Sequence, residues 1–145
     1  MLSNGRLPKV VLVEIYILYI RSIVEQSAVV WHSSITKGEE RDLERVQKVA
    51  LKIILKEEYS TYQGALDLVG LQTLKARRAR LCLNFAKKCT KSEKTSKMFP
   101  LNEKIVETRH HERFHVTMAK TNRLAASSIP YMQWLLNAHS KRNKL

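Results

Sequence analysis

The stretch from Leu71 to Cys89, LQTLKARRARLCLNFAKKC, constrains the fold more than any other part of the chain. Thr73 suits a helix N-cap, and no glycine or proline follows Gly70 before Pro100, so a helix of several turns is predicted. At about 100° per residue, one sector of this helix is apolar. That sector contains Leu74, Leu81, Cys82, Phe85 and Cys89. The sector beside it contains Arg77, Arg80, Lys87, Lys88 and Lys91. One face is therefore expected to pack and its neighbour to meet solvent or phosphate.

The positive charge of the chain is concentrated in and after this stretch. The 145 residues include 26 Lys and Arg against 13 Asp and Glu. Residues 1–72 carry nine basic and nine acidic side chains, whereas residues 73–97 carry nine and one, and residues 98–145 carry eight and three. An excess of this size favours polyanionic partners, meaning nucleic acid or an anionic membrane surface. The apolar run Ile15–Ile20 is far shorter than the ~20 residues of a membrane span, so a transmembrane helix is rejected. RNA or DNA, and not a membrane, is the expected partner.

Hydrophobic periodicity predicts further helices. Residues 9–31 repeat apolar side chains at helical spacing, although their β-branched content also suits strands. Thr36 and Glu39 have the spacing of a capping box that opens a helix to about Lys56. A short helix at 62–69 is expected between Ser60 or Thr61 and a C-capping Gly70. The predicted inward face of the 37–56 helix consists of Leu43, Val46, Ala50, Ile53 and Ile54.

The predicted architecture is mainly α: a small bundle of about four helices, then an irregular C-terminal section with a short terminal helix. Residues 1–90 form the predicted helical domain, and residues 91–100 a basic flexible linker. Residues 101–145 form a loosely structured section with a short helix near 130–138, where Pro130 suits the first turn.

Catalytic motifs are weak throughout the chain. His111, Glu112 and His115 match the zinc-protease pattern H-E-x-x-H, but the flanking sequence does not read as a helix, and a chance match is favoured over a metal site. The chain has only two aspartates, Asp42 and Asp67, so a two-metal centre is not expected. The glycines form no phosphate-binding or dinucleotide fingerprint. The expected protein is not an enzyme and has no cofactor, no metal and no small-molecule substrate.

The candidate site is the basic helix face: Arg77, Arg80, Lys87, Lys88 and Lys91 are the predicted phosphate contacts. A purely solvated surface is the competing interpretation, and Lys75–Arg80 also resembles a nuclear-localisation string. Arg78 lies in the apolar sector, so it is predicted to be buried against a carboxylate, Glu44 or Asp67. Cys82 and Cys89 would lie about 10 Å apart on a helix, beyond disulfide reach, and are predicted to be reduced thiols of a nuclear or cytoplasmic protein.

Several strings in order along the chain resemble a known family. They are YILYIRSIVEQSAVVWHSSIT (Tyr16–Thr36), LERVQKVALKIIL (Leu43–Leu55), YSTYQGALDLVGLQTLKARRARLCLNFAKK (Tyr59–Lys88) and SSIPYMQWLLN (Ser127–Asn137). Together they are similar to the C-terminal, post-thumb region of non-LTR, LINE-type (jockey-like) retrotransposon reverse transcriptases. The resemblance covers nearly the whole chain.

The resemblance implies a non-catalytic fragment of an RNA-directed DNA polymerase, because the polymerase and endonuclease motifs of such polyproteins lie upstream. It also implies that Met1 is an internal methionine of a decayed or truncated element, or that the coding sequence begins further upstream. RNA, DNA and the missing upstream polymerase domain are the implied partners. Two alternatives remain: a protein-interaction or scaffold module that packs on the polymerase domain, and a non-functional decayed element. A zinc hydrolase that uses His111 and His115 is a remote third.

Overall fold

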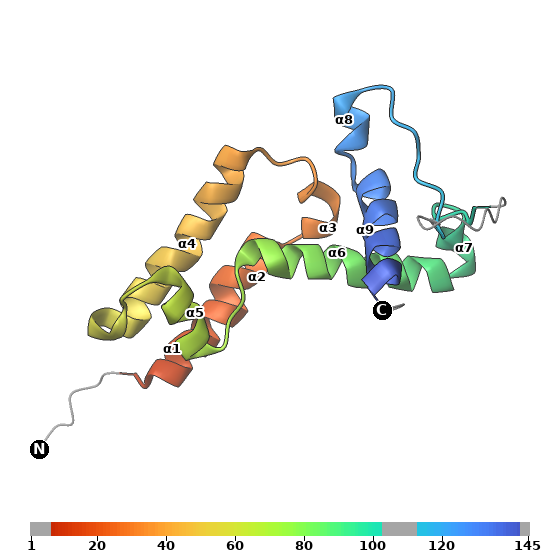
Figure 1. Ribbon diagram of the computed structural model, residues 1–145. Helices are drawn as coiled ribbons and strands as arrows, with labels where there is room; N and C mark the ends of the chain where they lie inside the picture. The colour runs from red at the N-terminus through yellow and green to blue at the C-terminus, as the bar shows by residue number, and fades with distance from the viewer. Residues whose placement is uncertain (1–6, 103–112, 143–145) are drawn as a thin grey trace, which may run out of the picture. The chain divides into compact units, whose positions relative to one another are not determined.

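The computed structural model of the protein describes residues 7–102 and 113–142 and is mainly α-helical, as the sequence predicts. Within the described residues, the β-structure consists of one isolated antiparallel bridge between Leu101 and Phe114. The chain, whose helices are labelled in Figure 1, divides into two compact units. Unit 1 contains residues 1–26 and 36–77, and unit 2 contains residues 27–35 and 78–145. The boundary between Arg77 and Arg78 lies within a helix (Leu74–Lys91) and not in the segment 91–100 that was predicted to be a linker.

The N-terminal segment is a broken helix. Its parts are α1 (Lys9–Ile15), the π-helical η1 (Tyr16–Arg21), α2 (Ser22–Glu25) and, in unit 2, α3 (Ala28–Trp31). The prediction of one helix over 9–31 is therefore wrong at Gln26 and Ser27, where Gln26 has ψ 127° and Ser27 has a left-handed φ of 53°. The Ser22 hydroxyl donates to the carbonyls of Leu18 and Tyr19, a local bond that competes with regular α-helix hydrogen bonding.

The next helices of unit 1 begin and end where the sequence predicts. They are α4 (Lys37–Leu55), the 3₁₀ turn η2 (Lys56–Glu58) and α5 (Tyr62–Val69). Thr36 and Glu39 form the predicted capping box, in which the Thr36 amide donates to Glu39 Oε2 at 2.7 Å. Thr61 caps α5, and Gly70 ends it with a left-handed φ of 66°.

The buried face of α4 differs from the predicted one. Its buried residues are Gln47, Leu51, Ile54 and Leu55. Val46 and Ile53, which were predicted to face inward, are 40% and 65% exposed. A prediction from hydrophobic periodicity assigns glutamine to the exposed face of a helix, so it could not predict that the buried face of α4 includes Gln47. The side chain of Gln47 is buried at little cost, since its Oε1 accepts from the Tyr16 hydroxyl and its Nε2 donates to the Gln72 carbonyl, both at 3.0 Å.

Helix α6 (Leu74–Lys91) is the predicted basic helix, and its residues to Arg77 belong to unit 1. Thr73 caps it, because the Ala76 amide donates to the Thr73 hydroxyl at 3.2 Å. In unit 2 it is followed by α7 (Glu93–Ser96), α8 (Asn122–Ala125) and α9 (Ser128–Arg142). The segment 91–100, which was predicted to be a flexible linker, thus contains α7. The helix predicted near 130–138 is α9, which begins two residues earlier and ends four residues later.

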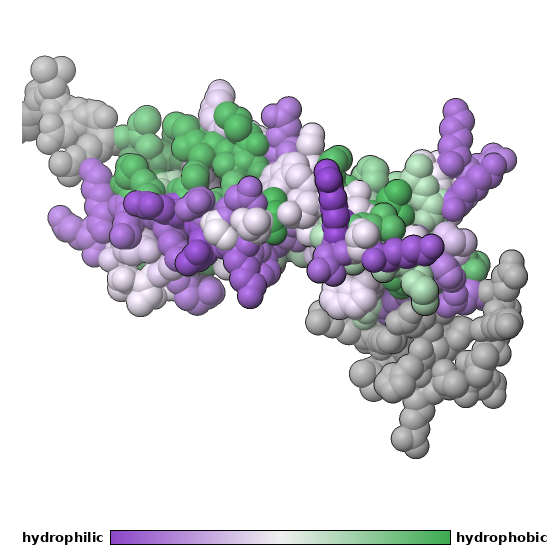
Figure 2. All heavy atoms as spheres, turned by 90° about the horizontal axis from the view of Figure 1, so that it is seen from above, coloured by the Kyte–Doolittle hydropathy of each residue, from purple (hydrophilic) through white to green (hydrophobic). Residues whose placement is uncertain are grey.

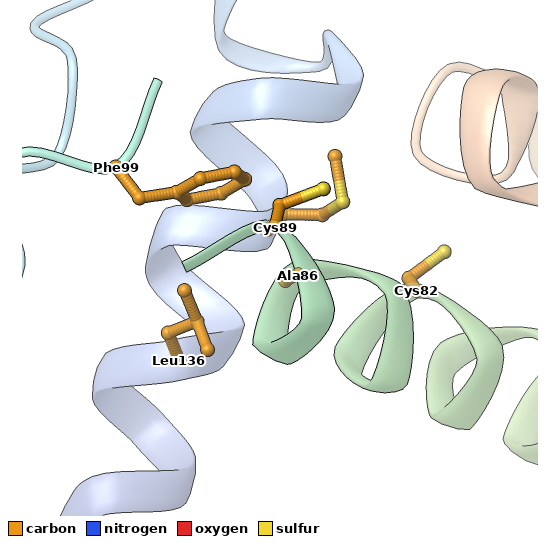
Figure 3. Packing of buried hydrophobic residues seen from close by; sticks show 6 residues of the cluster. Cys82, Ala86, Cys89, Phe99 and Leu136 are labelled. Atoms are coloured by element: carbon orange, nitrogen blue, oxygen red, sulfur yellow. The ribbon is translucent and has the colours of Figure 1, made fainter. Parts of the chain in front are cut away.

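The core of unit 2 lies between α6, α9 and Phe99, which follows the end of α7 by three residues (Figure 3). The buried members of this cluster are Cys82, Ala86, Cys89, Phe99, Met132 and Leu136. Both cysteines are buried free thiols, as predicted. Phe85 was predicted to be core but is 45% exposed, because Ala86 occupies the buried position next to it. The small alanine side chain suits a close approach between two helices better than a phenylalanine ring does.

Two buried amides of α9 fix the chain that connects α7 to α8. Asn137 accepts from the Phe114 amide and donates to the Phe114 carbonyl, each at 2.9 Å. Gln133 accepts from the Thr117 amide at 2.8 Å and donates to the Met98 carbonyl at 2.8 Å. These side chains provide hydrogen-bond partners for backbone N–H and C=O groups that a neighbouring strand would pair in a sheet. Irregular segments can therefore pack on a helix.

Candidate nucleic-acid interface

The five predicted phosphate contacts fall into different surroundings. Arg80, Lys88 and Lys91 are exposed, whereas Lys87 is half-buried. Arg77 belongs to unit 1, where its Nε donates to both carboxylate oxygens of Glu25, at 2.7 and 2.9 Å. Because this ion pair neutralises its charge locally, Arg77 is better placed to stabilise unit 1 than to bind a phosphate. Four residues of the predicted set therefore remain as candidates.

Arg78 is buried, as predicted, with an exposed fraction of 0%. Within unit 2, its Nε donates to Nδ1 of His32 at 3.4 Å, and its guanidinium carbon lies 5.6 Å from the centre of the Trp31 ring. The other ring nitrogen of His32 lies 3.2 Å from the hydroxyl of Tyr131. The suggested carboxylate partners, Glu44 and Asp67, belong to unit 1, so that pairing stays a prediction. Arg78 is part of the interior and is not a ligand contact.

A cavity of about 990 Å³ opens in unit 2 between α6, α9 and the segments on either side of the Leu101–Phe114 bridge. Lys87, Lys91, Lys97, Arg113 and His139 line it with nitrogen-bearing side chains. Thr90, Ser96 and Ser140 add hydroxyl groups, and Phe99, Pro100, Leu101, Phe114 and Leu136 add apolar surface. The described residues that line the cavity include no aspartate and no glutamate. An anion would therefore meet donors on several sides.

One lysine that lines this cavity contacts a side chain of another helix. The Nζ of Lys87 lies 3.0 Å from Nε2 of His139. An ammonium group only donates hydrogen bonds, so the imidazole nitrogen is the acceptor. The contact joins α6 to α9 across the cavity rim and limits the freedom of a side chain that would otherwise have many rotamers.

Sequence reasoning found Lys87 and Lys91 but missed Lys97, Arg113 and His139. Lys97 was included in a flexible linker, and Arg113 and His139 lie in a section predicted to be loose. The excess of basic residues after Thr73 was the only sequence signal for these positions. Long-range packing, which brings residues 87–101 against residues 113–140, is what gathers them at one cavity.

A second hollow, in unit 1, differs from this cavity because carboxylates line it. Its volume is about 590 Å³, and its lining contains three carboxylates, Glu40, Asp42 and Glu44. Lys75 Nζ lies 3.0 Å from Oε2 of Glu40 there, so part of its basic charge is already neutralised. Carboxylates repel phosphate, and this hollow is a poor candidate for nucleic acid.

The described residues contain no group of three or more His, Cys, Asp or Glu side chains placed to hold a metal ion. His111 and Glu112 of the H-E-x-x-H match lie outside the described residues, and His115 is exposed. Burial raises the pKa of the Cys82 thiol to about 11, which disfavours the nucleophilic thiolate.

None of the described helices combines the length and the apolar character that crossing a membrane requires. Comparison with protein-family models, with curated proteins and with solved structures finds no match for the chain.

Proposed function

We propose that the chain is a non-catalytic, helical nucleic-acid-binding segment from the C-terminal region of a non-LTR retrotransposon reverse transcriptase. Its phosphate contacts are Arg80, Lys87, Lys88 and Lys91 of α6. The gathering of cations in unit 2 carries the proposal, because basic side chains from separate parts of the chain, Lys87 and Lys91 among them, line one cavity whose described lining has no acidic residue. Such a surface neutralises phosphates, releases counterions and binds without regard to sequence.

The distribution of charge supports unit 2 over unit 1 as the binding surface. The sequence of unit 1 has 11 basic and nine acidic side chains, whereas that of unit 2 has 15 basic and four acidic ones, so unit 1 has much the smaller net charge. In unit 2, the exposed cations of α6 continue past its end into Lys94 and Lys97. Figure 2 shows long hydrophilic side chains projecting from this part of the surface.

Charge removal at matched positions tests the binding proposal. The test variant replaces Arg80, Lys87, Lys88 and Lys91 with alanine. The control variant replaces four exposed cations of unit 1, Lys37, Arg45, Lys52 and Lys56, and so has the same net charge. At low salt the test variant should bind RNA and DNA oligonucleotides at least about tenfold more weakly than the control does. Equal loss in both variants, or no binding by the wild type, would rule the proposal out.

The retrotransposon assignment has a separate test. The genomic sequence upstream of the codon for Met1 should contain, in frame, a reverse-transcriptase palm with paired aspartates. A promoter and an untranslated leader at that place would contradict the assignment without affecting the binding experiment.

A protein-interaction module is the second candidate, and one observation favours it. The N-terminal helices of unit 1 expose large apolar side chains: Val10 is 70% exposed, Leu18 65%, Tyr19 68% and Ile23 72%. Figure 2 shows hydrophobic residues gathered on the side of unit 1 near the N-terminal trace. Large exposed apolar patches mark contact sites between proteins. Sedimentation of the isolated chain against a Leu18→Ser, Ile23→Ser variant tests this function, which predicts self-association of the wild type only.

A further inference from the structure

The lining of the unit 2 cavity combines cationic side chains with apolar ones, and a site for phosphate alone would not need the apolar side chains. Leu101 is 58% exposed, Pro100 is exposed and Phe114 is half-buried, so their apolar surface is open to a ligand. The guanidinium carbon of Arg113 lies 5.8 Å from the centre of the Phe114 ring. Aromatic rings and guanidinium planes are the groups on which proteins stack unpaired bases.

The volume of the cavity suits a small organic group as well as an ion. At about 990 Å³ it lies at the upper end of the range, roughly 300–1,000 Å³, that ligand sites in proteins occupy. The two parts of a nucleotide complement this lining: its phosphate is anionic, and the flat faces of its base stack on aromatic and apolar surface. Lys87 and Lys91 on α6 are on the rim, whereas Leu101 and Phe114 come from the segments joined by the bridge.

We propose that this cavity holds an unpaired nucleotide of a single strand, with its phosphate at Lys87 and Lys91 and its base against Leu101 and Phe114. The inference rests on the proposed function and adds to it a preference for single strands. A paired base is stacked inside the duplex and has to be extruded before it can enter a pocket, which opposes duplex binding. An unpaired base has a free face and needs no extrusion.

Three probes of equal length separate contact with the base from contact with the phosphate. They are a single-stranded oligonucleotide, an abasic strand with the same number of phosphates, and a duplex, each titrated with the full chain at low salt. The single strand should bind about tenfold more tightly than the abasic strand, as expected for one stacked base. It should also bind more tightly than the duplex. RNA and DNA versions of the single strand show which sugar the cavity accepts.

A pair of leucine variants shows whether the base lies in this cavity. Leu101→Ser removes apolar surface from the wall, and it should weaken binding of the normal strand while leaving the abasic strand unchanged. The matched control is Leu124→Ser, since Leu124 is 43% exposed in unit 2 and does not line the cavity. Lys91→Ala should weaken all three probes, because each has phosphates.

The outcomes distinguish this inference from the proposed function. Equal affinity for the three probes, or a Leu101→Ser effect that is the same for normal and abasic strands, overturns the single-strand inference and leaves phosphate binding intact. Failure of all three probes to bind overturns both.

Discussion

Lys87 and His139, 52 residues apart in sequence, meet at 3.0 Å between Nζ and Nε2, on the rim of the cationic cavity. Most surface lysines are mobile, and holding one at a binding site costs entropy at the moment of binding. Here the imidazole of α9 already limits where the ammonium group of α6 can lie. A phosphate at this rim therefore meets a donor that is partly ordered beforehand, which favours affinity.

The hydroxyl of Tyr16 is predicted to stabilise unit 1 through Gln47. Tyr16→Phe removes the donor at 3.0 Å from Gln47 Oε1 and leaves that buried oxygen without this bond. The free energy of unfolding should fall by about 1–2 kcal/mol, measured by urea denaturation. Tyr19→Phe is the matched control, because Tyr19 is 68% exposed, and it should change stability by less than about 0.5 kcal/mol. Equal effects of the two substitutions would contradict the buried hydrogen bond.

The same tyrosine makes stability depend on alkaline pH. Burial raises the pKa of Tyr16 from 10.0 to about 12; Arg21 lowers it, and Glu25 and Glu44 raise it further. A folded-state pKa above the unfolded one gives a contribution that is complete below about pH 10 and is lost as the pH rises toward 12. Urea titrations between pH 8 and 12 should show a steeper decline for the wild type than for Tyr16→Phe. Parallel curves would show that Tyr16 ionises with an ordinary pKa in the folded chain.

Two glycines of unit 1 should respond to alanine with opposite signs. Gly70 ends α5 with φ 66°, a conformation that alanine adopts only with strain, so Gly70→Ala should cost about 1 kcal/mol. Gly38 lies inside the first turn of α4, where a Cβ atom would meet the Thr36 hydroxyl at an ordinary 3.7 Å. Gly38→Ala should therefore stabilise the unit by about 0.5–1 kcal/mol. Thermal or urea unfolding of both variants measures the change in the free energy of unfolding. A change of the same sign in both variants would contradict the backbone conformations described for Gly70 and Gly38.

Rules that act over a few residues predicted much of this fold. The Thr36–Glu39 capping box, the N-caps Thr61 and Thr73 and the C-cap Gly70 each depend on a local hydrogen bond or backbone angle, so the sequence alone was enough. The buried face of α4 was not predictable in the same way. Gln47 can be buried because Tyr16, 31 residues earlier, donates to it and the carbonyl of Gln72, 25 residues later, accepts from it.

The candidate site shows the same limit. The charge pattern of α6 identified Lys87 and Lys91, but it could not show that Arg77 is held by Glu25, a residue 52 positions away. Nor could it bring Arg113 and His139 to the same cavity. These relationships arise from packing between distant segments, for which a single sequence contains no periodic signal.

Cysteine labelling reports whether α6 packs as described. Cys82 is 0% exposed, and burial raises its thiol pKa to about 11, so at pH 8 roughly one thiol in a thousand is ionised. Alkylation of Cys82 in the folded chain at pH 8 should be far slower than in urea, as mass spectrometry of the labelled peptide can measure. Labelling at the same rate with and without urea would mean that this face of α6 is accessible.

The salt dependence of nucleic-acid affinity tests the central claim most directly. The logarithm of the binding constant of the wild type for a single strand should fall linearly with the logarithm of salt concentration. Replacing both Lys87 and Lys91 with alanine should reduce the magnitude of the slope by about 1.4, because each phosphate contact on a single strand contributes about 0.7. The control replaces Lys120 and Arg123, two exposed cations of unit 2 that do not line the cavity, and should keep a slope closer to that of the wild type. An unchanged slope in the Lys87 and Lys91 variant would contradict phosphate binding at this cavity.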